Sequence, residues 1–333
     1  MTPTFNRAHE LAFLVPSIQN QTFPHEKFEM IIVDDGSTDG TQERVREWQE
    51  KVDFSLRYVS QSNQGPGAAR NLGMDVAQGE VLVFVDSDCE ADPHWLQTIY
   101  SRFTSEGFDA CGGPDASREN FTPLQKAIDF SMTSFLTTGG LRGHGSRRLA
   151  KFYPRSHNMG VTRELIDKVG GFGNLRHGQD IELSHRIIKS GAKVVYIPDA
   201  LVYHRRRTSP GRFFRQVFNW GVARINLGRI DRDMLEPLHF VPAVVTLVAV
   251  MIVGGLLVDP VEYGSLFELG LGLLLILSII GGLKKRNLRV GLYLVAVIPI
   301  QVFGYGLGFT VAFVKRFILG QGEWTGFTQR YYR

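Results

Sequence analysis

The pattern of apolar and polar residues divides the chain near residue 235 into two parts. In the first part, short apolar runs alternate with amphipathic stretches, and the clearest run is Val81 to Val85. A continuous apolar run of this length is typical of a strand buried on both faces of a parallel sheet. Similar short runs occur at 28–33, 56–59, 108–111, 194–197 and 200–203. Because helical patterns separate these runs, the sequence predicts an α/β domain with a largely parallel sheet covered on both faces.

Three longer apolar runs dominate the second part, at 238–258, 263–283 and 288–314. Each run is long enough to cross a hydrocarbon core of ~30 Å as a helix. The loop at 259–262 is acidic and the loop at 284–289 is strongly basic, so the positive-inside rule places the basic loop in the cytosol. Three simple spans would leave a basic tail outside. The third run is therefore bent or re-entrant, or the rule is overridden here.

A third pattern lies between these two parts. Phe214, Phe218 and Val222 recur at helical spacing among several arginines. Basic and aromatic residues mixed in this way predict a helix in the headgroup plane of a membrane, with packing against the soluble domain as the alternative. The expected division is a soluble domain at 1–208, an interface helix and linker at 209–235, transmembrane helices at 236–316 and a tail at 317–333.

Composition adds little to this picture. The formal net charge is +4, from 37 basic and 33 acidic residues, and gives no indication of nucleic-acid binding. The two cysteines, Cys89 and Cys111, form neither a disulfide framework nor a zinc spacing, which fits a reducing cytosolic compartment. No secretory signal peptide is visible at Met1.

Candidate chemistry begins with Asp86 and Asp88, which directly follow the strand at 81–85. Ligands of open α/β sheets bind outside the carboxyl ends of strands, and two such carboxylates can hold a divalent cation that bridges to phosphates. An isolated Asp-x-Asp is more often a solvated loop. Asp180 falls in the first turn of a predicted helix, where the helix dipole stabilises a carboxylate.

Six motifs, in their order and spacing, resemble the family-2 glycosyltransferases of the GT-A fold. The matching segments are 3–7 (PTFNR), 32–41 (IVDDGSTDGT), 63–71 (NQGPGAARN), 84–88 (FVDSD), 169–172 (VGGF) and 179–183 (QDIEL), with Tyr203-His204 behind. The resemblance covers roughly residues 2 to 205. It implies a Rossmann-like, mainly parallel sheet and transfer of a sugar, with inversion, from a nucleotide diphosphate to an acceptor.

The resemblance also assigns a metal site. It implies that Asp88 ligates Mg²⁺ or Mn²⁺ and that Asp86 contacts the ribose and the metal. His204 either completes the metal site, touches the diphosphate, or merely packs. A cation held there would neutralise the charge that develops on the leaving phosphate.

The nucleotide site is implied in the same way. Asp35 is placed against the base, with Pro3 and Thr4 beside it. Asp34 is the alternative partner there, or a structural carboxylate that caps the following turn. Arg70 holds the base or the diphosphate, or forms a surface salt bridge.

Asp180 matches the catalytic carboxylate of the family, the base that deprotonates the acceptor hydroxyl as it attacks. Family members often carry Glu before this Asp, and Gln179 stands there instead, which removes a second acid that could raise the pKa of the base. The Gln-x-x-Arg-Trp box of processive synthases is missing, and the segment around Arg215 to Trp220 does not replace it. Transfer of one or a few sugars is therefore expected.

Two further features follow from the resemblance and the composition. The first strand of the family normally precedes the 3–7 motif, and no room remains for it before Met1. We therefore expect the sheet to lack this strand, and our hypothesis is a truncated sequence or a reading frame that starts too late. A glycine-rich stretch from Thr137 to Ser146 predicts a loop that orders over substrate, or a disordered linker.

These expectations combine into a membrane-anchored glycosyltransferase, multi-pass in the inner (cytoplasmic) membrane, with a cytosolic catalytic domain. It would transfer sugar from a nucleotide diphosphate sugar to a lipid-linked or saccharide acceptor at the membrane surface. The expected process is surface polysaccharide or glycolipid synthesis, and no nucleic-acid partner is expected. One alternative is a polyprenyl-phosphate glycosyltransferase. Another is a catalytically silent, nucleotide-binding membrane scaffold.

Overall fold

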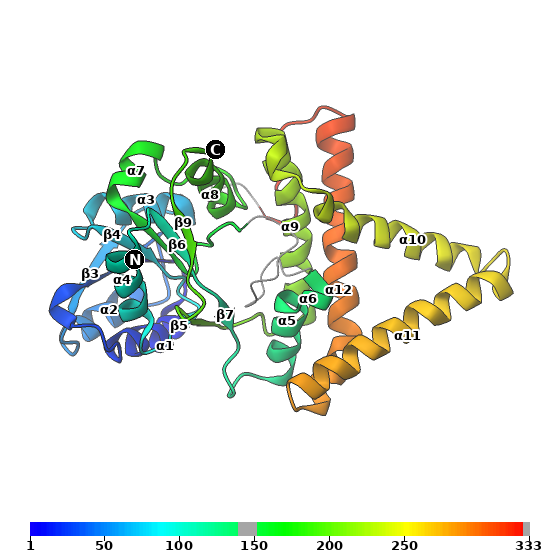
Figure 1. The fold of residues 1–333 in the computed structure, drawn as a ribbon, viewed down its shortest axis with the longest axis horizontal. Helices are drawn as coiled ribbons and strands as arrows, with labels where there is room; N and C mark the ends of the chain where they lie inside the picture. Colours follow the sequence, from blue (N-terminus) through cyan, green and yellow to red (C-terminus); the bar gives the residue numbers. More distant parts are fainter. Residues whose placement is uncertain (139–151, 329–333) are drawn as a thin grey trace. The chain divides into compact units, whose positions relative to one another are not determined.

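The computed structural model describes residues 1–138 and 152–328, which form two compact units (Figure 1). The sheet unit comprises 1–116 and 152–205, and the helical unit comprises 117–138 and 206–328. Most of the stretch that the sequence predicts as a glycine-rich loop, Thr137 to Ser146, lies outside the described residues.

Two ladders form the main sheet of the sheet unit. The first has the order β1-β2-β3 and is parallel throughout, and the second has the order β4-β8-β6-β9. β8 runs antiparallel to both of its neighbours, which the sequence did not predict. The bounds are β1 Thr2–Thr4, β2 Glu29–Asp34, β3 Ser55–Ser60, β4 Val81–Phe84, β6 Ala110–Gly112, β8 Met159–Thr162 and β9 Val194–Tyr196.

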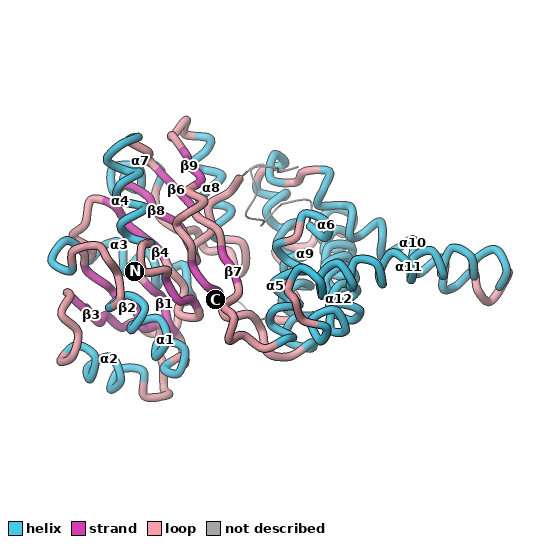
Figure 2. Tube along the Cα trace, turned by 60° about the horizontal axis from the view of Figure 1, so that its bottom comes forward, coloured by secondary structure: helices cyan, strands magenta, loops and turns pink. Residues whose placement is uncertain are grey.

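Helices cover both faces of this sheet, as predicted (Figure 2). One apolar core joins α1, α2 and α4 to the sheet, and the other joins α3, α7 and α8 to it. Local signals start several of these helices: Pro66 begins α3, and the hydroxyl of Thr162 caps α7 by accepting from the backbone N–H of Leu165. The bounds are α1 Ala8–Gln19, α2 Thr41–Gln49, α3 Pro66–Val76, α4 Trp95–Glu106, α7 Arg163–Val169 and α8 Gln179–Lys189, with a 3₁₀ turn at His25–Lys27.

A second, smaller sheet lies at the carboxyl ends of the main strands. Its order is β5-β10-β7, with β5 Cys89–Ala91, β10 Val202–His204 and β7 Asp115–Ala116. The sequence predicted a strand only at the β10 position, because strands of two or three residues are too short to show an alternating pattern. The pairing sets His204 opposite Cys89 and Val202 opposite Asp115.

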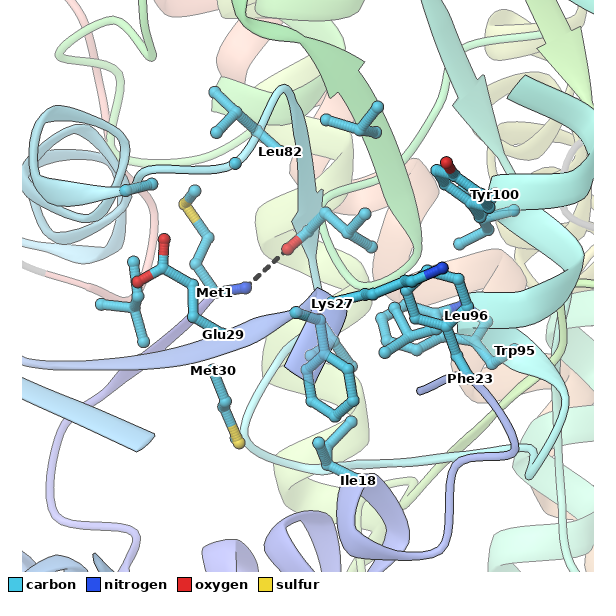
Figure 3. A pocket seen from close by; sticks show the side chains of 18 of the residues that line it. Met1, Ile18, Phe23, Lys27, Glu29, Met30, Leu82, Trp95, Leu96 and Tyr100 are labelled. Carbon is cyan, nitrogen blue, oxygen red and sulfur yellow. Dashed lines mark hydrogen bonds between the residues drawn. The ribbon is translucent and has the colours of Figure 1, made fainter. Parts of the chain in front are cut away.

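The first-strand position, which the sequence analysis expects to be empty, is partly filled. β1 pairs with β2 from Thr2 opposite Ile32 to Thr4 opposite Asp34, so the expectation that the sheet lacks this strand is corrected. Met1 joins β1 to β4, since its amino group donates to Val83 O at 2.6 Å and its carbonyl accepts from Val85 N at 3.1 Å. Beside Met1 lies a cavity of about 280 Å³ (Figure 3).

The core of the helical unit is formed by α5, α9 and α12. Buried side chains from all three helices pack together, among them Ile128, Val217 and Leu294. Close approach of α9 and α12 depends on glycine: a Cβ at Gly221 would lie 2.2 Å from Tyr305 O. The bounds are α5 Pro123–Thr133, α6 Phe135–Thr138, α9 Pro210–Ile230, α10 Val241–Gly255, α11 Pro260–Lys284 and α12 Leu288–Phe313, with short turns at Arg232–Met234, Pro237–Phe240 and Val314–Ile318.

Three helices of this unit are long and apolar enough to cross a membrane. They occupy Pro237–Gly255, Pro260–Lys284 and Leu288–Ile318, with mean hydropathies of 2.2, 2.3 and 1.8. Consecutive helices α10 and α11 extend as a pair away from α12 (Figure 1). Their apolar side chains are largely exposed, and a large exposed apolar surface of this kind suggests membrane association.

The predicted interface helix exists as α9, but its apolar side is already covered. Val222 is buried against Phe309, and Phe218 contacts Trp324 and Phe327 in the last described segment of the chain. Contact of the arginines of α9 with lipid headgroups stays a prediction.

Candidate active site

The predicted acidic residues lie at the carboxyl ends of their strands, where an open sheet places its ligands. Asp34 is the last residue of β2 and Asp86 follows β4 closely, while His204 is the last residue of β10. Backbone bonds tie the two sheets together here, since Arg205 N donates to Asp88 O at 2.8 Å.

The predicted metal residues Asp88 and His204 are in contact. His204 Nε2 lies 3.2 Å from Asp88 Oδ1, and the Asp88 side chain is 8% exposed. Together with Cys89 Sγ, these two residues offer ligand atoms that all lie within 4.8 Å of one another. Arg7 Nη1 donates to Asp88 Oδ2 at 3.1 Å and so compensates part of its charge. A carboxylate and an imidazole form a suitable donor set for Mn²⁺.

Asp86 is held by Arg70. Arg70 Nη2 donates to Asp86 Oδ1 at 2.6 Å, and its guanidinium lies 5.3 Å from the centroid of the Phe172 ring. The Arg70 side chain is 7% exposed and the Asp86 side chain 29%. Arg70 therefore does form a salt bridge, which was the alternative role considered for it. The guanidinium is buried rather than on the surface, and Asp86 is the more accessible partner.

The two acids that end β2 have different surroundings. Asp34 accepts from Ser37 N at 2.8 Å and from Tyr58 Oη at 2.6 Å, which is the turn-capping role considered for it. Burial and the hydrogen bond with Asp34 raise the pKa of Tyr58. Asp35 N donates to Thr4 O at 2.8 Å, so the predicted nucleotide residues of β1 and β2 are adjacent.

The carboxylate of Asp35 organises the loop that leads into α3. It accepts from Gln64 N at 2.8 Å, from Gly65 N at 2.7 Å and from Gln61 Nε2 at 2.7 Å. Gly65 has a φ of 94°, a conformation that glycine adopts without strain. Asp35 thus fixes the start of α3, and its contact with a nucleotide base stays a prediction.

Asp180 lies in the first turn of α8, as predicted, and is 22% exposed. Arg155 Nη1 lies 3.8 Å from Asp180 Oδ2, and both the cation and the helix N-terminus favour the ionised carboxylate. Sequence reasoning did not find Arg155, because no motif surrounds it. Glu182, two residues further along α8, accepts from Arg186 Nε at 2.7 Å.

Gln179, which replaces the Glu of related sequences, packs toward α3. It is buried, and its Nε2 donates to Gly173 O at 3.2 Å. A Cβ at Gly67 would lie 2.5 Å from Gln179 Nε2. The small residues at the start of α3 therefore admit this side chain, which fixes α8 and its Asp180 against α3.

A second group at the site, Asp115 and His157, was missed. Asp115 Oδ2 lies 3.5 Å from His204 Nδ1 and 3.8 Å from His157 Nε2, and all three residues lie within metal-ligand reach of one another. Asn158 holds this group by donating to Pro114 O at 2.9 Å and to Ala200 O at 2.7 Å. The sequence offered only the adjacent His157 and Asn158 as a signal. This pair indicates nothing until the pairing of β7 with β10 brings Asp115 beside His204.

Comparison with known proteins decides the family. Residues 1–170 match the family model described as Glycosyl transferase family 2. The chain belongs to glycosyltransferase family 2. Glycosyltransferase AglE of Haloferax volcanii is 28% identical over 236 residues, which are 70% of this chain and 75% of AglE. Glycosyltransferase GlyG of Streptococcus pneumoniae is 29% identical over 232 residues, 67% of this chain and 75% of GlyG.

Solved structures agree on the fold of this family-2 glycosyltransferase. The mannosyltransferase PcManGT from Pyrobaculum calidifontis, in complex with GDP-mannose and Mn²⁺, aligns with a TM-score of 0.63 at 20% identity. The alignment covers 91% of this chain and 86% of that one. The predicted family, the GT-A-like Rossmann-type fold and the glycosyltransferase activity are confirmed.

Proposed function

We propose that this glycosyltransferase moves a sugar, with inversion, from a nucleotide diphosphate to a lipid-linked acceptor at the membrane surface. The observation that carries the proposal is the placement of three predicted groups at one edge of the sheet unit. Asp88 with His204 forms one group, Asp86 with Arg70 the second, and Asp180 at the start of α8 the third.

Asp88 and His204 are the residues that would hold Mg²⁺ or Mn²⁺, with Asp86 beside them. Their ligand atoms, 3.2 Å apart, suit two neighbouring positions around one ion. When bound, the ion neutralises negative charge on the leaving diphosphate. The Mn²⁺ complex of PcManGT supports this assignment. Arg7, which contacts Asp88, keeps that carboxylate ionised and oriented.

Asp180 is the proposed base. The acceptor hydroxyl oxygen attacks the anomeric carbon from the face opposite the diphosphate, and the bond from that carbon to the diphosphate oxygen breaks. The leaving oxygen takes the bonding electrons, while Asp180 takes the hydroxyl proton. A single displacement inverts the anomeric carbon, so the product has the configuration opposite to the donor.

The donor nucleotide is proposed to lie between β1 and α3. Asp35, Pro3 and Thr4 would surround the base, and Asp86 would accept from the ribose hydroxyls. Arg70 would position Asp86 and face the diphosphate. Support comes from the contact of β1 with the end of β2 and from the buried Arg70–Asp86 pair.

The membrane arrangement follows from a contrast within the helical unit. In their most apolar stretches, 17% of α10 residues and 11% of α11 residues are buried, against 39% in the third helix. α12 packs along α9, whose several arginines do not suit a membrane interior. We therefore infer that α10 and α11 cross the cytoplasmic membrane as a hairpin. α12, one continuous helix from Leu288 to Phe313, stays beside α9 without crossing, with both ends on the cytosolic side.

This arrangement places the basic residues of 284–289 and of the tail in the cytosol, with the catalytic domain, as the positive-inside rule requires. A reporter fused after Arg333 should give a cytosolic signal, and one inserted at 259–262 an external signal. An external signal after Arg333 would instead establish three simple spans.

The function is tested with the full-length protein in lipid nanodiscs and a panel of radiolabelled nucleotide sugars. We expect label in the lipid fraction, inverted at the anomeric carbon and lost in EDTA. Label on a polyprenyl phosphate would identify the alternative acceptor, and absence of both transfer and donor hydrolysis would contradict catalysis. Asp88→Ala should abolish metal-dependent donor binding, while Asp167→Asn, on the exposed side of α7, should leave it unchanged.

A further inference from the structure

A second group of metal-ligating side chains lies beside Asp88 and shares His204 with it. The group consists of Asp115 in β7, His157 in the turn before β8, and His204 in β10, with ligand atoms that all lie within 4.8 Å of one another. Asp115 Oδ2 lies 3.5 Å from His204 Nδ1 and 3.8 Å from His157 Nε2. Ligand atoms about 2.0 Å from a tetrahedral Zn²⁺ are roughly 3.3 Å apart. Small side-chain movements would therefore bring these atoms around one ion.

The backbone that carries this group is held in place by the buried Asn158. Its amide donates to Pro114 O at 2.9 Å and to Ala200 O at 2.7 Å. Asp115 directly follows Pro114, and His157 directly precedes Asn158. The amide thus fixes the two residues beside each other before any ion binds, and a preorganised site loses little entropy on binding.

Burial and donor chemistry distinguish this group from the Asp88 site. The Asp115 side chain is 4% exposed, His157 12% and His204 17%, so the ligands are largely desolvated but reachable from solvent. Two imidazole nitrogens and one carboxylate oxygen are a donor set that suits Zn²⁺. Mg²⁺ instead prefers oxygen ligands, which Asp86 and Asp88 supply. The two neighbouring groups are therefore suited to different ions.

His204 faces both groups, one with each ring nitrogen. Its Nε2 lies 3.2 Å from Asp88 Oδ1, and its Nδ1 lies 3.5 Å from Asp115 Oδ2. A neutral imidazole has one nitrogen with a free lone pair and one N–H. When Nε2 ligates an ion beside Asp88, the N–H at Nδ1 points to Asp115, and a carboxylate in this place fixes the tautomer. When Nδ1 ligates an ion beside Asp115, the N–H at Nε2 points to Asp88 in the same way.

We propose that Asp115, His157 and His204 form a zinc site whose occupancy withdraws His204 from the ion at Asp88. Zn²⁺ bound there takes the lone pair of Nδ1, so Nε2 carries the proton and has no lone pair for a second ion. Zinc is then an inhibitor of Mn²⁺ binding that acts from a neighbouring site. The zinc site itself does not depend on the proposed function, whereas the inhibition rests on the proposed Mg²⁺ or Mn²⁺ site.

The zinc site is tested with the full-length protein in lipid nanodiscs, freed of metal and without nucleotide. Zn²⁺ affinity is measured by competition with a chromophoric chelator in the parent, in His157→Gln and in His94→Gln. His157 is part of the second group but not of the group around Asp88, and His94 is exposed just before α4. We expect His157→Gln to weaken zinc binding by about 100-fold, since losing a ligand costs at least as much as losing its outer partner. His94→Gln should bind zinc like the parent, and equal affinities in all three proteins would overturn the site.

X-ray absorption of the zinc-loaded parent provides a second measurement, which does not depend on the folding of a variant. We expect two imidazoles and one carboxylate around the ion. One imidazole or none would overturn the site.

The inhibition is tested by electron paramagnetic resonance of Mn²⁺ with and without one equivalent of Zn²⁺. In the parent, zinc should weaken Mn²⁺ binding by about 10-fold or more, and in His157→Gln the same amount of zinc should have little effect. An equal loss in both proteins would show that zinc displaces Mn²⁺ at Asp88 itself, and would overturn the inhibition from a neighbouring site. If the parent binds zinc but no Mn²⁺ at all, the proposed Mn²⁺ site and the inhibition both fail, while the zinc site stands.

Discussion

Asp88 in the sheet unit and Asp129 in the helical unit are both buried carboxylates with basic neighbours. Asp129 lies 3.1 Å from Arg206 Nη2 and 2.9 Å from Lys285 Nζ, so two cations surround one acid. Around Asp88 the acids are more numerous, because Asp86 and Asp115 lie nearby together with Arg7, Arg70 and the imidazole of His204. The single acid among the helices thus has two cations beside it, whereas several acids gather at the sheet edge.

This difference separates two uses of a buried charge. Asp129 belongs to α5, Lys285 directly follows α11, and Arg206 lies just before α9. This cluster therefore holds helices together. The Asp88 cluster lies among loops and strand ends, and its grouped carboxylate and imidazole ligand atoms suit a cation. We expect substitutions in the first cluster to change stability and those in the second to change function.

The largest effect is expected at Asp180, which lies at the edge of the acidic cluster. Asp180→Asn should lower the transfer rate by about 10²–10⁴-fold, because the amide cannot accept the acceptor proton. Donor affinity and the unfolding midpoint should stay unchanged, since Asp180 lies at the start of α8 and its distance of 3.8 Å from Arg155 is too long for a close ion pair. Single-turnover kinetics with Asp167→Asn as the control measure this. Retained activity would remove the base assignment.

Asp129→Asn should lower the free energy of unfolding by about 3–5 kcal/mol. The substitution leaves Arg206 buried without its carboxylate, and breaking a buried pair in this way is costly. Thermal or urea unfolding in detergent measures the loss, and the turnover of the remaining folded protein should match that of the parent. A variant of normal stability with weakened metal binding would break the distinction between the clusters.

The buried amino group of Met1 belongs to neither cluster, and its effect on stability depends on pH. The folded amine has a pKa of about 5 and the unfolded amine one of 8.0. Between these values the unfolded state binds more protons, so stability rises with pH, by up to about 4 kcal/mol. It is lowest below pH 5 and constant above pH 8. The same chain with an acetylated amino terminus should lack this increment, and equal pH profiles would contradict a buried amine.

Asp115→Asn should have the smallest effect, a loss of about 10–100-fold in Mn²⁺ affinity. Asp115 lies beside Nδ1 of His204, and a carboxylate there orients Nε2 toward Asp88. Mn²⁺ titration followed by electron paramagnetic resonance measures the affinity, with Asp199→Asn in an exposed turn as the control. An unchanged affinity in Asp115→Asn, with a loss in His204→Ala, would assign Asp115 to packing. No change in either variant would remove His204 from the metal site.

Motif order identified several of these candidate residues before the structure brought them together. Asp86, Asp88 and Asp180 were placed by the strand or helix that each one follows or begins, and the three long helices were found by their apolar length. Asp115 and His157 were not found, because they reach His204 through β7, a strand of two residues. The Asp129 cluster was missed because its three members are far apart in the sequence and share no motif.

The sequence by itself determined the alternation of strands and helices, the acidic strand ends and the apolar helices, since each depends on residues close together along the chain. Only the tertiary structure decided that Asp34 caps its own turn, that Arg70 is buried under Asp86, and that α9 packs against α12. It also showed β1 ending at a cavity between β2 and β4. These outcomes depend on which segments, distant in the sequence, pack together and bury each other's polar groups. Local sequence patterns do not encode those contacts.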